Sequence, residues 1–264
     1  MASRNGLNPK IRGPKGVGYG RALPAAFGFG NGIVTNANGY LSIPAFIGAN
    51  VTTPISFELW TKISSIFNYS WCGIKFNYSS YNMHFNIDAR GGAATHDSGS
   101  AITFPTGIYN HIVSFFDPTI TDTSKPNIGT IVNAYPGGYD TPGYCPSIAL
   151  FPTYPVSVMN VCGDVSGTEL NPYPMDEFRI YNKVLSLEEI SSNYNNGLGS
   201  NPSITENLLA WYKFQEFETL DFSRLQDGSD MRLGIRDYSG KNNHAQAISL
   251  DTNPTSGTYS LQPF

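Results

Sequence analysis

Residues Met175 to Ile190 read MDEFRIYNKVLSLEEI, and this stretch decides the fold. Its first half contains β-branched and aromatic residues within an alternating pattern, which predicts a strand over Asp176–Tyr181. Its second half changes to helical spacing. The stretch is therefore typical of a strand that leads directly into a short helix.

The start of that helix is marked by Ser186, which has Glu189 three residues further on, the spacing of a capping box. Apolar side chains then follow at helical spacing: Leu187, Ile190 and Tyr194. We expect a helix over residues 186–195 that ends near Asn195-Asn-Gly197, where the glycine takes the left-handed conformation.

Outward from this stretch, short β-type runs alternate with turn residues from Ala25 onward. The clearest run is Ile55 to Ile63, whose alternation places every second residue on one face: Ile55, Phe57, Leu59, Thr61 and Ile63. The other predicted strands are Tyr40–Pro44, Cys72–Tyr78, Met83–Asp88, Tyr109–Phe116, Gly129–Ala134, Val156–Cys162, Leu208–Gln215 and Ala245–Leu250. About ten strands of this kind predict an all-β, two-sheet antiparallel jelly-roll sandwich.

The chain has 264 residues, a length that one all-β domain can reach. Its 16 Tyr, 16 Phe, 27 Gly and 18 Pro suit half-buried strands and tight turns. A chain of this length buries enough apolar surface to fold without a disulfide or metal. The sequence has no run of 18 apolar residues, so no membrane-spanning helix is indicated.

Residues 1–22 form a basic, Gly/Pro-rich arm with no apolar periodicity. Residues 1–57 contain five of the 16 basic residues and no acid, so residues 58–264 hold 11 basic against 20 acidic residues. The five basic residues are Arg4, Lys10, Arg12, Lys15 and Arg21. Such a segment cannot order itself alone, so we expect it to lie on a partner, either another copy or a different protein of a large assembly.

The stretch Met175–Ile190 resembles the closing motif of the laminin-G-like and concanavalin A-like jelly-roll family, a last strand followed by a capped helical turn. Residues 55–63 resemble the early core strand of that family, and residues 107–117 resemble the strand that usually carries Trp-His-His-Val. The resemblance covers residues 23–195. It implies a jelly roll that serves as a display or binding module.

Residues 207–214 and 237–245 resemble segments that normally open such a domain, yet here they come last. One interpretation is a circularly permuted jelly roll over residues 23–264, completed by C-terminal strands within residues 207–250. The alternative is a second, truncated domain. The remaining 65 or so residues are too few for a complete second jelly roll, which favours the permuted form.

The resemblance also implies a calcium ion at the rim of the sandwich. Asp237 and Asn242 offer hard oxygen ligands from one loop, and Asp176 of the closing motif could meet them. The alternative is that Asp237 and Ser239 only fix a tight turn that ends in Gly240. Both interpretations stay open at this point.

Catalysis is not indicated by the sequence. Retaining glycosidases need two carboxylates that point into one groove, whereas Asp176 and Glu177 are adjacent and are expected on opposite faces of their strand. The four histidines lack metal-ligand spacing and are expected to be structural or surface residues: His84, His96, His111 and His244.

The tyrosine-rich loops are the candidate ligand-binding surface, because rigid aromatic rings beside amide and hydroxyl groups suit sugars and protein partners. The residues are Tyr78, Tyr81, Tyr135, Tyr139 and Tyr144. Alternatively, these side chains only cover the ends of the sandwich. The widely spaced charges of the arm are a weak signal for nucleic acid.

Two functions follow as hypotheses, both without catalysis. The first is a capsid-associated protein of a virus or bacteriophage particle, a decoration, spike or minor capsid component, because no apolar export segment follows the N-terminal charges. The alternative is a carbohydrate-binding or adhesion module of a secreted or cell-surface protein, which the fold and the tyrosines suit.

Overall fold

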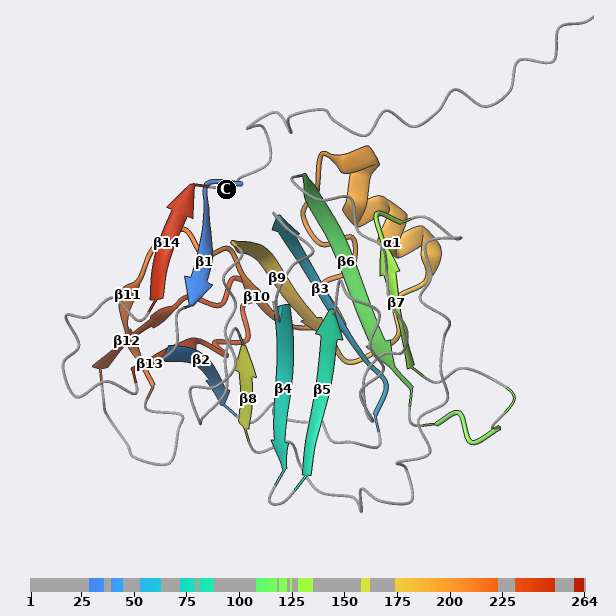
Figure 1. The fold of residues 1–264 in the computed structure, drawn as a ribbon, viewed down its shortest axis with the longest axis horizontal. Helices are drawn as coiled ribbons and strands as arrows, with labels where there is room; N and C mark the ends of the chain where they lie inside the picture. Colours follow the sequence, from blue (N-terminus) through green and yellow to red (C-terminus); the bar gives the residue numbers. More distant parts are fainter. Residues whose placement is uncertain are drawn as a thin grey trace, which may run out of the picture.

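The fold is known from a computed structural model, which describes residues 29–35, 39–44, 53–62, 72–78, 81–87, 108–117, 119–122, 124, 128–134, 158–161, 174–222, 231–249 and 259–263. These residues form two antiparallel β-sheets and one short α-helix (Figure 1). The prediction of an all-β jelly-roll sandwich is confirmed.

The first sheet, here called sheet A, has seven strands in the order β14-β1-β9-β3-β6-β7, with β10 paired to β9. Its strands are β1 (Asn31–Thr35), β3 (Ile55–Lys62), β6 (Tyr109–Phe116), β7 (Ile128–Val132), β9 (Met175–Tyr181), β10 (Leu208–Tyr212) and β14 (Tyr259–Pro263). The long central strands β3, β6 and β9 therefore lie next to one another.

The second sheet, sheet B, also has seven strands, in the order β11-β12-β13-β2-β8-β4-β5. Its strands are β2 (Gly39–Pro44), β4 (Cys72–Tyr78), β5 (Tyr81–Ile87), β8 (Val158–Val161), β11 (Glu218–Asp221), β12 (Met231–Ile235) and β13 (Ala245–Ser249). Strands β11 and β5 form its two edges.

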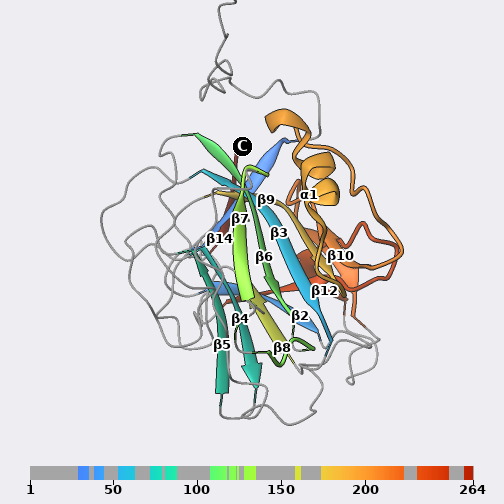
Figure 2. The same cartoon turned by 90° about the vertical axis from the view of Figure 1, so that its right-hand side faces the viewer.

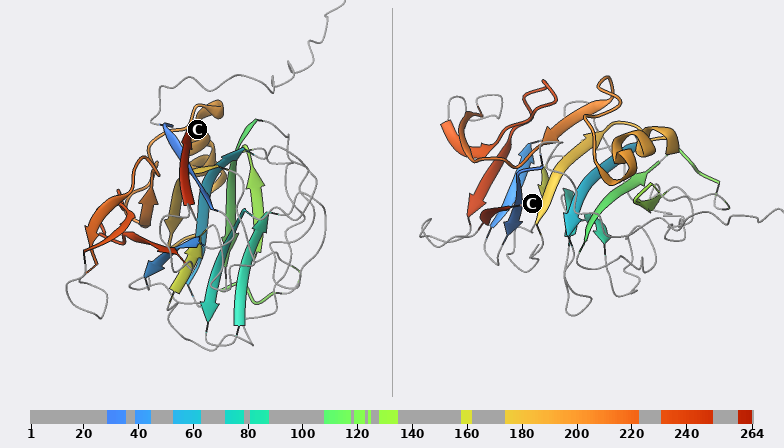
Figure 3. Two further views of the ribbon diagram at one scale, coloured as in Figure 1. Left: turned by 60° about the vertical axis from the view of Figure 1, so that its left-hand side comes forward. Right: turned by 90° about the horizontal axis from the view of Figure 1, so that it is seen from above.

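The C-terminal strands complete sheets that the N-terminal half begins. Strand β13 pairs with β2, β10 with β9, and β14 with β1. Figure 3 shows β1 and β14 side by side although they come from opposite ends of the chain. The late strands thus lie in the same two sheets as the early ones, and circular permutation of the jelly roll stays a prediction.

The predicted helix is α1 (Leu187–Tyr194), and Ser186 is its N-cap with the full capping box to Glu189. The helix ends near Asn195-Asn-Gly197 as predicted, and Gly197 is left-handed with φ 86°. The left-handed residue that closes α1 is Asn195, with φ 48°, and a 3-10 turn η2 (Asn195–Gly197) follows. Asparagine tolerates this conformation better than most residues, so the helix ends two positions before the glycine.

The core between the sheets comes from the inward-facing residues of the central strands. Phe57 of β3 and Phe178 of β9 are buried and their rings stack with centroids 6.4 Å apart. The ring of Phe178 also stacks on Tyr212 of β10, at 6.1 Å. Sheet B contributes Leu41 and Ile43, both fully buried.

Both faces of β3 are buried, which the alternating sequence alone did not predict. The helix α1 covers the outer face of sheet A beside β3, β6 and β9 (Figure 2). An outer apolar cluster joins the helix to the sheet: Val113, Ile131, Tyr181, Leu185, Ile190 and Leu208. No helix among the described residues is long and apolar enough to span a membrane.

Candidate functional site

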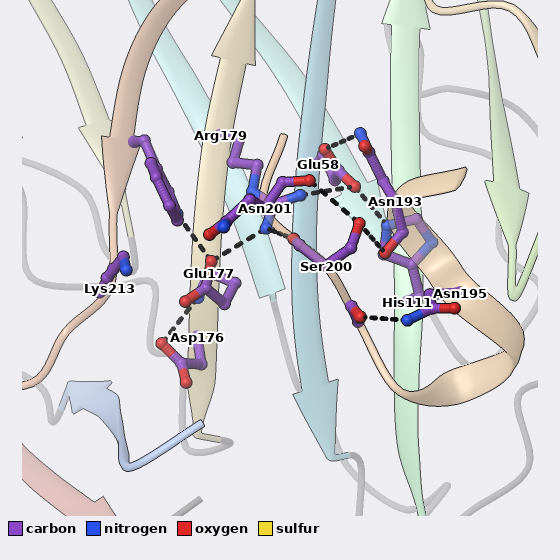
Figure 4. A network of polar contacts seen from close by, with 12 residues as sticks. Glu58, His111, Asp176, Glu177, Arg179, Asn193, Asn195, Ser200, Asn201 and Lys213 are labelled. Carbon is purple, nitrogen blue, oxygen red and sulfur yellow. Dashed lines mark hydrogen bonds and ion pairs between the residues drawn. The ribbon is translucent and has the colours of Figure 1, made fainter. Parts of the chain in front are cut away.

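A buried polar network lies beneath α1 on the outer face of sheet A (Figure 4). Its centre is the Glu58 carboxylate, whose Oε1 lies 2.6 Å from Nε2 of His111 and 3.4 Å from Nη1 of Arg179. The other oxygen, Oε2, accepts hydrogen bonds from the Tyr181 hydroxyl at 2.8 Å and the Asn193 amide at 2.9 Å. All five residues are fully buried.

The network holds Glu58 ionised. Burial by itself raises the pKa of this carboxyl, but the charge of Arg179 and the hydrogen bonds from His111 and Tyr181 outweigh it and lower the pKa to about 2. Asn193 belongs to α1, so the same carboxylate fastens the helix to β3. We interpret this part of the network as structural, because none of its side chains reaches the surface and a buried ion pair fixes specific geometry. His111 is fully buried in this network, and its purely structural role stays a prediction.

A β-bulge in β9 extends the network toward the surface. Glu58 pairs with Arg179 but Trp60 pairs with Asp176, so β9 has one residue more than β3 over this span. Glu177 has φ 53° and absorbs the extra residue. The expectation that Asp176 and Glu177 point to opposite faces is wrong, because the bulge breaks the alternation and places both carboxyl groups on the outer side of β9 (Figure 4).

Glu177 fixes the side chain of Trp211 on β10. Its Oε2 accepts a hydrogen bond from the indole Nε1 at 2.6 Å and another from Nη2 of Arg179 at 3.0 Å. The second oxygen of Glu177, Oε1, and the Oδ2 of Asp176 are buried and have no hydrogen-bond partner among the described residues. The bulge therefore presents two carboxylates that are only partly satisfied.

Trp211, Lys213 and Tyr238 form a surface that we call the aromatic corner. The Lys213 Nζ lies 4.2 Å from the centroid of the Trp211 ring and 5.2 Å from that of Tyr238. The two rings meet edge to face with centroids 6.2 Å apart, and the Tyr238 backbone N–H donates to the Trp211 carbonyl at 2.7 Å. Tyr238 is 41% exposed, while Trp211 and Lys213 are half-buried.

The sequence interpretation did not identify the aromatic corner. Residues 208–215 were predicted as a strand, and the regular alternation over its last part places Ala210 and Tyr212 on the inner face and Trp211 on the outer one. An outward tryptophan next to a lysine was the available signal. The positions of Asp176 and Glu177 beside it could not be predicted, because the sequence does not reveal the bulge in β9.

The hydrogen bonds of Asp237 are those of a turn. Its Oδ1 accepts from the backbone N–H groups of Trp211 and Ser239 at 2.9 and 2.8 Å, and its Oδ2 accepts from the Ser239 hydroxyl and the Asn243 N–H at 2.8 and 2.9 Å. Asn242 lies exposed in the same loop with φ 58°.

Both carboxylate oxygens of Asp237 are thus already used within the loop, and no three acidic, histidine or cysteine side chains converge for a metal anywhere in the described ranges. These hydrogen bonds favour the turn over a calcium site. Asp176, the third proposed ligand, lies outside the loop on strand β9. A calcium site formed by Asp237, Asn242 and Asp176 stays a prediction.

The other predicted site residues lie largely outside the described part of the chain. Tyr78 and Tyr81 face each other in register where β4 meets β5, but their side chains are outside the description. The remaining predicted residues are outside it altogether: Tyr135, Tyr139, Tyr144, Arg4, Lys10, Arg12, Lys15 and Arg21.

No protein-family model matches the chain, and no curated protein matches it. Solved structures do. A candidate carbohydrate-binding protein of Bacteroides ovatus ATCC 8483 is 16% identical with a TM-score of 0.50, and the match covers 89% of this chain and 60% of that chain. The chain thus spans about three fifths of the length of that structure.

Two further solved structures match with lower TM-scores. The heptameric SAP-like pentraxin of Limulus polyphemus is 9% identical, with a TM-score of 0.41 over 85% of this chain and 96% of that chain. Mouse laminin α1 domains LG4-5 are 9% identical, with a TM-score of 0.35 over 67% and 48% of the two chains. At such low identities the likeness to the Bacteroides structure defines the fold alone, that of a jelly roll.

Proposed function

We propose that the protein is a non-catalytic carbohydrate-binding module and that the aromatic corner contacts the sugar. The observation that carries this proposal is the outward indole of Trp211, held in one orientation by its hydrogen bond to Glu177. Aromatic faces presented rigidly beside polar groups suit the apolar faces and hydroxyls of sugar rings. The fold, shared with a candidate carbohydrate-binding protein, supports the same function.

The carboxylates near the corner do not support a catalytic alternative. Asp176 and Glu177 are fully buried, and one oxygen of Glu177 is engaged by Arg179 and Trp211. A general acid or nucleophile must reach the scissile bond within hydrogen-bond distance. In this arrangement Glu177 orients the side chain of Trp211.

Binding to a panel of immobilised glycans tests the proposal. Tyr238→Ala and Trp211→Leu should each weaken binding of any captured glycan by about five- to tenfold, because each removes an aromatic contact. The control is Leu198→Ala, which removes an exposed apolar side chain beyond the end of α1. Binding that survives both corner variants would place the sugar elsewhere, for example on the five predicted tyrosines.

Assembly through the N-terminal arm is a second candidate function, favoured by the basic residues 1–22 on an acidic body. The structures named above include no viral or phage protein, so a place in a particle rests on the arm alone. If the arm joins copies, the full chain forms oligomers and a chain without residues 1–22 is a monomer, as light scattering would show. Equal masses for both chains would contradict assembly through the arm.

A further inference from the structure

The ammonium group of Lys213 occupies a cation site that the protein builds from its own side chains. It lies over the rings of both Trp211 and Tyr238, a geometry in which the negative faces of the rings attract a cation. The indole N–H of Trp211 donates to Glu177 of the bulge, whose own backbone N–H donates to Asp176. Burial raises the pKa of both carboxyl groups, and the positive charge of Lys213 offsets a part of this rise.

The charge balance of the buried side chains shows why a cation is favoured there. Arg179 is shared by two buried carboxylates, Glu58 at 3.4 Å and Glu177 at 3.0 Å. One formal negative charge of this group is therefore left over, and Lys213 over the Trp211 ring is a further cation beside it. Burial, followed by the charge of Glu177, raises the pKa of Asp176 well above its usual range. The formal charges of Glu58, Glu177 and Arg179 thus sum to one negative charge, which Lys213 balances.

Lys213 holds this position only weakly. Its side chain is a long stem of four methylene groups on a half-buried residue at the end of β10, and an exposed cation–π contact contributes little affinity, about threefold. No ion pair involving Lys213 within 4.0 Å is present among the described residues. A ligand that brings its own cation can therefore displace it at little cost.

We infer that the ligand of the aromatic corner is a glycan with protonated amino sugars, whose ammonium group takes the place of Lys213 Nζ. This inference rests on the proposed carbohydrate-binding function and names its ligand class. The sugar ring lies on the Trp211 face that the lysine stem vacates. The ligand ammonium then experiences the same rings and the same field of Asp176 and Glu177 that now hold the lysine.

The alternatives fit the site less well. A sugar with a carboxylate or sulfate would bring a further negative charge next to Glu177. An N-acetylated sugar would displace the lysine cation without replacing its charge. Only a cationic sugar exchanges one ammonium group for another and leaves the charge balance unchanged.

The experiment compares two probes by calorimetry: an oligomer of glucosamine with free amines and the fully N-acetylated oligomer of the same length. The intact chain should bind the free amine at least about tenfold more tightly. Lys213→Met should strengthen binding of the free amine about threefold, because it removes the internal competitor and keeps the length of the stem. Lys183→Met is the control, since it removes one positive charge beside Glu189 at α1; it should change affinity less than twofold.

The outcomes separate this inference from the proposed function. Equal or tighter binding of the N-acetylated oligomer by the intact chain overturns the amino-sugar inference and leaves carbohydrate binding standing. Weaker binding of the free amine by Lys213→Met also overturns it, because the lysine would then be a ligand contact. Failure of the intact chain to bind any sugar of the glycan panel removes the proposed function itself. Because the two probes are compared on the unaltered chain, this test does not depend on whether any variant folds.

Discussion

The indole N–H of Trp211 donates a 2.6 Å hydrogen bond to Glu177, the residue whose left-handed backbone forms the bulge of β9. A backbone irregularity in the centre of a sheet thus sets the orientation of a side chain at the surface. Bulges commonly redirect side chains in this way near functional sites. Four predictions follow from the side chains that this arrangement joins.

Glu177→Ala should lower the free energy of unfolding by about 2 kcal/mol or more, because it leaves the buried Arg179 and the Trp211 N–H without their shared acceptor. Urea unfolding measures the change. The control is Glu216→Ala, which removes an exposed acid between β10 and β11 and should cost less than about 0.5 kcal/mol. Equal effects of the two variants would show that the Glu177 contacts are dispensable.

The Glu58 network should make the fold sensitive to acid. The pKa of Glu58 is lowered from 4.5 to about 2 in the folded state, so its contribution is complete above about pH 4.5 and is lost as the pH falls through about 2. The contribution is about 3 kcal/mol.

Urea unfolding between pH 6 and pH 2 should show this loss for the natural chain and a smaller one for Glu58→Gln, which cannot titrate. Glu206→Gln, an exposed acid, should keep the natural profile. A Glu58→Gln profile parallel to that of the natural chain would contradict the assignment of the acid-sensitive group.

Asp176→Asn should stabilise the protein at pH 7. Burial and the charge of Glu177 raise the pKa of Asp176, so its ionisation opposes folding as the pH rises above its unfolded value of 3.8. The amide oxygen of asparagine can still accept the 2.7 Å hydrogen bond from the Glu177 N–H. The stabilisation, measured by urea unfolding, should be larger at pH 7 than at pH 4. A loss of stability at pH 7 would show that the ionised carboxylate has a cationic partner.

The calcium site and the turn give different results for the loop of Asp237. If Asp237, Asn242 and Asp176 hold calcium, added calcium raises the melting temperature and EDTA lowers it. If Asp237 only closes the turn through its four hydrogen bonds, Asp237→Ala lowers the melting temperature equally with calcium or EDTA. Identical melting curves of the natural chain in calcium and EDTA would contradict the metal site.

Much of the fold could be predicted from local pattern. The strands β4 and β6 have the bounds that the sequence predicted, and Ser186 with Glu189 marked the start of α1. The strands β1, β11, β12 and β14, at or next to the sheet edges, were not predicted. Short strands such as β11 (Glu218–Asp221), with exposed and buried residues but few apolar ones, have no periodic signal to distinguish them from loops.

The sequence by itself determined the class of fold, because alternating burial, turn residues and a capping box are local properties of the chain. Only the tertiary structure decided where the candidate site lies. Burial of Glu58 depends on a helix 130 or so residues away, and the shared side of Asp176 and Glu177 depends on one extra residue in β9. Period-two alternation assumes a regular strand, and a bulge is defined only by the register against its neighbour. For that reason the contact between Trp211 and Glu177, which defines the proposed sugar surface, is a property of the folded sheet.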